Sequence, residues 1–101
     1  MNSVFKALGD PTRRRILQLL RAREMTAGEI SDQFDLAKPT LSGHFAVLRE
    51  ARLVSAEKAG TSITYRLNLS VLQDALLGFA DSFGMGKPQT PLIEPQNPEV
   101  P

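Results

Sequence analysis

Apolar side chains in the first quarter of the chain recur at the spacing of an α-helix. The stretch PTRRRILQLLRARE places four of them on one broad face: Ile16, Leu17, Leu19 and Leu20. Asp10 followed by Pro11 predicts the start of this helix, because aspartate caps free N–H groups and proline fits the first turn. A shorter helix is expected before it, capped by Ser3, running to Leu8 and closed by Gly9.

The stretch MTAGEISDQF carries the signals of a third helix. Thr26 and Glu29 have the spacing of a capping box, in which each side chain accepts a hydrogen bond from the other residue's backbone N–H. Met25 and Ile30 occupy the positions of a hydrophobic staple around the same start. We expect this helix to end near Phe34.

A turn from Asp35 to Lys38 leads into a fourth helix, which is expected to begin around Lys38 or Pro39. Three apolar residues recur in it at i, i+4 and i+7 and should face the core: Leu41, Phe45 and Leu48. Gly43 interrupts this helix, although glycine costs about 1 kcal/mol there relative to alanine. The outward side of the helix is therefore unusually bare.

Alternating apolar and polar residues predict two strands after the fourth helix, in LVSAEK and SITYRLN. In the second strand Ile63, Tyr65 and Leu67 point one way, whereas Ser62, Thr64 and Arg66 point the other. The letters AGT between the strands provide the glycine that a hairpin turn needs. The two strands should form a β-hairpin.

The stretch SVLQDALLGFADSFG predicts a last helix that begins at Ser70 with Gln73. Its main apolar stripe consists of Leu72, Leu76, Phe79 and Phe83, widened by Val71, Ala75 and Ala80. Leu77 falls outside the stripe. Asp74 and Asp81 mark the solvent side.

The order helix, helix, helix, helix, hairpin, helix predicts a mainly α fold with a small β-hairpin, the winged helix-turn-helix. Residues 1–86 should form this single domain. Five of the seven prolines fall in the stretch GKPQTPLIEPQNPEVP. Because proline excludes helix and ladder pairing, residues 87–101 are expected to be a disordered proline-rich tail.

Composition narrows the classes of function. The 101 residues hold no cysteine, which excludes disulfides, thiolate metal sites and a cysteine nucleophile. No apolar run has the length of a membrane span and no signal-peptide pattern opens the chain, so a cytoplasmic protein is expected. Residues 24–35 carry four acidic side chains and no basic one, whereas residues 36–69 carry five basic and two acidic ones. The second segment suits contact with a polyanion.

The fourth helix turns a small, polar face outward near its N-terminus. Its DNA-binding candidates are Lys38, Pro39, Thr40, Ser42, Gly43 and Val47. Such a face can enter a major groove and reach base edges, whereas solvated faces usually carry Glu, Lys and Gln. The hairpin adds four candidates for phosphate contact: Lys58, Thr61, Ser62 and Arg66. Gly43 either lets the helix backbone sit deep in the groove or is a tolerated change at an exposed position.

The first and last helices hold more apolar residues than a domain of this size can bury from one side. These dimerisation candidates are Val4, Phe5, Leu8, Leu72, Leu76, Leu77, Phe79 and Phe83. Packing against the same helices of a second copy would cover them, and would set two recognition helices about 34 Å apart. The alternative is that they only roof the core of one chain.

The sequences FKALGDPTRRRILQLL, MTAGEISDQFDLAKPTLSGHFAVLREARLV and GTSITYRLN resemble the ArsR-type winged-helix repressors. Within that family the motifs DPTRR, MTAG and KPT, with VLQD near the end, are most similar to the SdpR-type autorepressors. The resemblance implies a homodimer that binds a palindromic operator, often in its own promoter, and blocks polymerase. It also implies control through sequestration by a membrane partner.

Two residues depart from the family pattern. Many relatives have serine before the recognition helix, where Ala37 cannot cap, and a larger polar or basic residue where this chain has Gly43. The metal sites of the family are missing, since the first helix of the helix-turn-helix has no cysteine and the last helix has no histidine. We therefore expect no metal and no other cofactor. His44, the only histidine, should pack beside the core and position the recognition helix.

Other readings of the sequence stay open. The basic run Arg13–Arg15 either contacts phosphate or, as we expect, pairs with acids of the fold such as Asp10 or Glu50. The domain is either a DNA-binding regulator or a winged-helix module for protein contacts alone, and a regulator could respond to a non-metal ligand between the dimerisation helices. An enzyme is disfavoured, because no nucleophile–base pair, paired carboxylates or phosphate-binding glycine loop appears.

Overall fold

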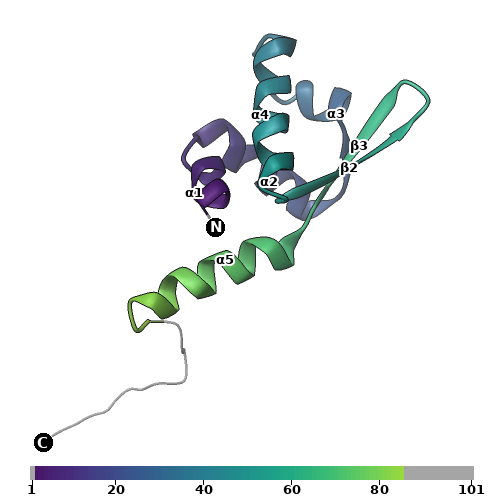
Figure 1. Cartoon of the computed structure of the whole chain (residues 1–101). Coiled ribbons are helices and arrows are strands. Elements are labelled where there is room, and N and C mark those ends of the chain that lie inside the picture. The colour runs from purple at the N-terminus through teal and green to yellow at the C-terminus, as the bar shows by residue number, and fades with distance from the viewer. Residues whose placement is uncertain (1, 86–101) are drawn as a thin grey trace, which may run out of the picture.

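The computed structural model describes residues 2–85, which form a helical body, a three-stranded sheet and a final helix (Figure 1). The elements are α1 (Asn2–Leu8), α2 (Pro11–Ala22), β1 (Met25–Thr26), α3 (Ala27–Ser31), α4 (Lys38–Glu50), β2 (Val54–Ala59), β3 (Ser62–Leu67) and α5 (Leu69–Ser82). This is the predicted winged helix-turn-helix, with α3 and α4 as its helix pair and β2–β3 as its wing. The predicted tail, residues 87–101, lies outside the described residues.

Local capping explains where two of the helices begin. The carboxylate of Asp10 accepts hydrogen bonds from the N–H groups of Thr12 and Arg13, at 2.8 and 3.2 Å, directly before α2. The capping box of Thr26 and Glu29 is present at the start of α3, with bonds of 2.9 and 3.1 Å. Both predicted helix starts are confirmed.

Three predicted helix boundaries were wrong. Helix α1 already includes Asn2, so Ser3 lies inside its first turn rather than at its cap. Helix α3 ends at Ser31 and passes through a turn, so it stops three residues before Phe34. Helix α5 begins at Leu69, which leaves Ser70 inside its first turn rather than at its cap. The residue before α5 is Asn68, and its side-chain amide donates to the carbonyl of Arg52 at 2.9 Å instead of capping the helix.

The sheet has one strand more than the sequence predicted. Its order is β1–β3–β2, with antiparallel pairing throughout. Strand β1 is only two residues long, and Met25 pairs with Tyr65 while Thr26 pairs with Thr64. This short strand ties the start of α3 to the wing, so the helix-turn-helix and the wing are held as one unit.

The core lies where α4 crosses α2 and the sheet. The three α4 residues predicted to face inward are all buried: Leu41, Phe45 and Leu48. They meet Ile16, Leu17 and Leu20 of α2 in one apolar cluster. The ring of Phe45 stacks on that of Tyr65, with centroids 4.4 Å apart and planes 19° from parallel. Helix α4 is therefore fixed on its inner side, and its outer side is left for solvent or a partner.

The C-terminus of α4 turns into the wing through a residue in the left-handed conformation. Arg52 has a φ of 61°. Its N–H donates a hydrogen bond to the carbonyl of Arg49 at 2.9 Å, and the N–H of Leu53 donates to the carbonyl of Leu48 at 3.1 Å. This is the hydrogen-bond pattern of a Schellman motif, where glycine usually takes the position of Arg52. The fully buried Leu48 and Leu53 close the motif.

The basic run of α2 holds the end of α1. The guanidinium of Arg13 donates to the carbonyls of Ala7 and Lys6, at 2.8 and 3.0 Å, and Arg14 donates to that of Leu8 at 2.8 Å. The expected partners were acids, so this part of the prediction was wrong. Carbonyls at a helix C-terminus attract cations because the helix dipole is negative there. Such backbone partners cannot be found by counting charged side chains in the sequence.

His44 joins the same junction from α4. Its Nδ1 atom lies 3.2 Å from the NH1 atom of Arg13 and 3.9 Å from a carboxylate oxygen of Asp10. The packed, hydrogen-bonded position expected for this histidine is the one that the structure shows. One guanidinium thus contacts both the last turn of α1 and the side of α4.

Candidate nucleic-acid interface

The outer face of α4 has the small, polar character that its sequence predicted. Lys38, Thr40, Ser42 and Gly43 are exposed, and Pro39 is exposed in the first turn. A Cβ atom added to Gly43 would have no heavy atom within 4 Å, so nothing in the folded chain requires glycine at this position. Val47, also a candidate, is half-buried and packs against the core cluster. The small, polar and exposed part of this face is therefore its N-terminal half.

The start of α4 has no side-chain cap. Ala37 occupies the cap position and makes no capping hydrogen bond, as its sequence predicted, while its carbonyl accepts from the N–H of Leu41 at 3.1 Å. Backbone N–H groups at such a start favour anions, because the helix dipole is positive there.

The wing presents its turn to solvent. Gly60 has φ of 63°, which suits the tight turn between β2 and β3, and Lys58, Thr61 and Ser62 around it are exposed. Figure 1 shows the wing tip and the first turn of α4 at the end of the molecule that lies away from α5. Helix start and wing tip can therefore face the same extended partner.

Arg66 lies at the base of the wing, away from this tip. Its guanidinium donates to a carboxylate oxygen of Glu24, with the NH2 atom at 3.0 Å. Both side chains are more than half exposed, so the pair is weak and open to exchange. Sequence reasoning did not anticipate Glu24, because the two residues are far apart in the chain and meet only through the pairing of β1 with β3.

Two titratable groups near the interface have shifted pKa values. Partial desolvation raises the pKa of Asp10, but hydrogen bonds from the N–H groups of Arg13 and Thr12, aided by nearby positive charge, outweigh it and lower that pKa overall. Burial raises the pKa of Tyr65, against the opposing charge of Arg49. Asp10 therefore stays ionised and Tyr65 stays neutral at ordinary pH.

The dimerisation candidates separate into two groups in the structure. Val4 is only 4% exposed and belongs to the chain's own core, and Phe5, Leu8 and Leu72 are half-buried. The others are exposed on α5: Leu76 at 46%, Leu77 at 57%, Phe79 at 48% and Phe83 at 67%.

Aromatic rings form the centre of this apolar surface. Phe79 lies 5.1 Å from Phe5 of α1 and 5.1 Å from Phe83, measured between ring centroids. Leu69 and Met85 are exposed apolar residues as well, although sequence reasoning left both out. Leu69 stands three residues before Leu72, so extending the helical stripe backwards could have found it.

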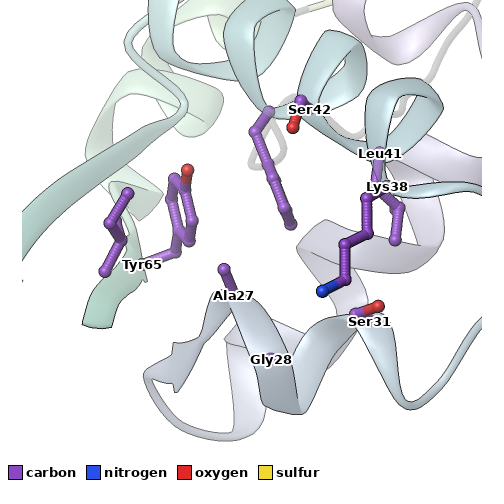
Figure 2. A pocket seen from close by; sticks show the side chains of 9 residues that line it. Ala27, Gly28, Ser31, Lys38, Leu41, Ser42 and Tyr65 are labelled. Carbon is purple, nitrogen blue, oxygen red and sulfur yellow. The ribbon is translucent and has the colours of Figure 1, made fainter. Parts of the chain in front are cut away.

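A pocket opens between α3, α4 and β3, beside the outer face of α4 (Figure 2). Its volume is ≈ 250 Å³. The lining residues are Ala27, Gly28, Ser31, Lys38, Leu41, Ser42, Phe45, Ile63 and Tyr65. Two of them, Lys38 and Ser42, are also DNA-binding candidates, so the pocket and the candidate interface share an edge.

Within residues 2–85, no three side chains of histidine, aspartate or glutamate gather closely enough to hold a metal ion. The expectation that the chain binds no metal stays a prediction. None of the described helices combines the length and the apolar character needed to cross a membrane.

The described geometry defines a class of protein, the winged helix-turn-helix regulators, and comparison with known proteins defines the family. Residues 10–56 match the family described as "Bacterial regulatory protein, arsR family". The transcriptional repressor SdpR of Bacillus subtilis (strain 168) is 49% identical over 75% of this chain and 84% of its own length. An arsenical resistance operon repressor of Staphylococcus aureus is 34% identical over 75% of this chain and 73% of its own length.

Solved structures agree with these relatives. An ArsR-family transcriptional regulator superimposes with a TM-score of 0.76 at 27% identity, covering 88% of this chain and 92% of that one. A possible transcriptional regulator for arsenical resistance gives 0.68 at 37% identity, covering 77% and 80%. The chain belongs to the ArsR family: it is a DNA-binding transcriptional regulator of winged helix-turn-helix fold, and not an enzyme.

Proposed function

We propose that the protein is a homodimeric repressor that binds an inverted repeat in double-stranded DNA, with its own promoter among the targets. The observation that carries the proposal is the exposed, small, polar face at the start of α4. Hydroxyl groups there can contact base edges, and the bare position at Gly43 allows close approach of the helix to the groove floor. Such a protein acts in the cytoplasm, where its DNA is.

The apolar surface of α5 supports the homodimer. Phe79 and Phe83 are about half and two-thirds exposed, and each aromatic side chain is worth roughly 1.5–3 kcal/mol when it is fully removed from water. A second copy placed around a two-fold axis would cover both rings with the same surface. Two recognition helices related in this way fit major grooves about 34 Å apart, which is the geometry of an inverted repeat.

The interface divides into residues for affinity and residues for selectivity. Lys38 and, on the wing, Lys58 supply positive charge for phosphates, and the hydroxyls of Thr61 and Ser62 can bond phosphate oxygens. Thr40 and Ser42 lie where base edges would be, so they supply discrimination. Arg66 contributes only after it leaves Glu24.

The decisive experiment is selection of bound sequences from random duplexes by the purified full chain. We expect an inverted repeat whose half-site centres are about one helical turn apart. Gel shifts at two salt concentrations should then show that Lys38→Ala weakens binding to all sequences, whereas Ser42→Ala changes the preference among operator variants. A protein that is monomeric at micromolar concentration and binds no duplex at low ionic strength contradicts the proposal.

A further inference from the structure

The pocket between α3, α4 and β3 has an apolar interior. The stacked rings of Phe45 and Tyr65 form one wall, and Leu41, Ile63 and Ala27 complete the lining around them (Figure 2). Figure 2 shows Ala27 projecting into the space from α3. A cavity of ≈ 250 Å³ with such walls has room for a small, compact apolar group.

The polar side chains of the pocket are suited to a negatively charged ligand. Apart from Tyr65, its polar side chains are those of Lys38, Ser31 and Ser42, and no acidic residue lines it. Figure 2 shows the side chain of Lys38 reaching back toward α3, with its amine over the pocket. Among residues 2–85 no carboxylate pairs with this amine. The mouth of the pocket therefore holds one uncompensated positive charge.

Tyr65 adds a further polar group to the lining of the pocket. The residue is only 4% exposed, and its hydroxyl has no hydrogen-bond partner in the part of the chain that the structure describes. In Figure 2 this hydroxyl points toward α4.

We propose that this pocket binds a small monocarboxylate with a compact apolar body, and that the bound carboxylate releases the protein from DNA. The apolar body packs on the stacked rings of Phe45 and Tyr65, and the carboxylate pairs with Lys38 and accepts from the hydroxyl of Ser42. The release half of this inference rests on the proposed function, because Lys38 and Ser42 are also its DNA contacts. When the ligand binds both side chains, they are no longer available to contact the operator.

A saturated probe allows the pocket to be tested without DNA. Tyr65 is the only tyrosine and the chain has no tryptophan, so the ultraviolet emission of the protein reports on this pocket. Cyclohexanecarboxylate does not absorb where tyrosine does. Added to the full chain, it should change the emission saturably, whereas cyclohexylamine and inorganic phosphate at the same concentrations should not. No response to the carboxylate overturns the proposal, and an equal response to phosphate does so too, since it marks a site for the DNA backbone.

Variants connect the response to the named residues. Lys38→Met keeps the aliphatic stem and should weaken binding of the carboxylate roughly five-fold, because an exposed charge contributes modestly. Lys58→Met removes the same charge from the wing tip and should leave the titration unchanged. Ala27→Leu fills the pocket and should abolish the response while circular dichroism shows an intact fold. Equal effects of Lys38→Met and Lys58→Met overturn the assignment of Lys38.

The regulatory half needs a separate measurement. With operator DNA selected as above, saturating cyclohexanecarboxylate should weaken binding of the parent chain, and the Ala27→Leu variant should bind DNA but ignore the probe. Carboxylate binding without any change in operator affinity overturns the release step. If no duplex is bound even without the probe, the proposed repressor function fails, while the tyrosine titration still decides whether the pocket takes a carboxylate.

Discussion

Replacing Gly43 by alanine separates the stability of α4 from its fit to DNA. The residue is exposed in the middle of the helix, and the added methyl group would meet no atom within 4 Å. The full helix propensity difference should therefore appear as a gain of about 1 kcal/mol in the free energy of unfolding. For a domain of this size the gain corresponds to a rise of roughly 4–8 °C in Tm, measured at one fixed protein concentration.

The same variant should bind its operator more weakly. If the backbone at Gly43 sits close to the groove floor, the methyl group is an overpacked contact worth about 1 kcal/mol or more, or at least a five-fold rise in Kd. A gel shift or anisotropy titration on the selected operator measures this. Ser70→Ala is a matched control, because it removes a poor helix former from an exposed position in α5 without touching α4.

One result would refute this reasoning about Gly43. An alanine variant that is more stable and binds the operator as tightly as the parent chain shows that the groove has room for the methyl group. Glycine would then be a tolerated change at an exposed site. A variant that loses stability instead would contradict the open surroundings of Gly43 in the structure.

Three further changes have defined outcomes. Arg52→Gly should stabilise the fold by about 0.5–1 kcal/mol in urea titrations, since glycine relieves the positive φ at the end of α4; an unchanged midpoint would contradict this. Asp10→Asn should lower the Tm at neutral pH, and the difference from the parent should shrink below about pH 4, because a lowered carboxylate pKa gives stability that disappears as acid protonates the group; a constant difference would argue against it. Phe83→Ser should weaken the proposed homodimer at least ten-fold, roughly 1.4 kcal/mol, in sedimentation experiments while circular dichroism stays unchanged; an unaffected dimer would exclude this ring from the interface.

Elements with a local signal could be predicted from the sequence. Asp10 and Pro11 fix the start of α2, and the capping box of Thr26 and Glu29 fixes that of α3, because each acts within one helical turn. The buried face of α4 followed from its i, i+4, i+7 spacing. The exposed polar face of α4 followed too, since it is the opposite side of the same helix.

Features that depend on distant parts of the chain could not be predicted. Strand β1 is two residues long and exists only because Met25 and Thr26 lie beside β3, so no alternating run announces it. The left-handed backbone conformation at Arg52 could not be predicted either, because the glycine that usually indicates such a position is absent. Arg13 found carbonyl partners rather than acids, because the end of α1 folds back against α2.

The pocket under α4 shows the same limit. Its residues come from α3, α4 and β3, and only folding brings Lys38 near Tyr65. The sequence marked Tyr65 as an inward-facing strand residue. It gave no sign that the hydroxyl would lack a partner in the described fold, because that depends on what packs around the ring.

Arg13 links the end of α1 to the side of α4, so a movement of one helix affects the other. Since the guanidinium holds the carbonyls of Ala7 and Lys6 on one side and the ring of His44 on the other, α1 cannot rotate without pulling on α4 or breaking these bonds. Helix α1 also contacts α5 through Phe5 and Phe79. In the proposed homodimer, the orientation of each recognition helix would thus be coupled, through the side chain of Arg13, to the way that the two copies pack.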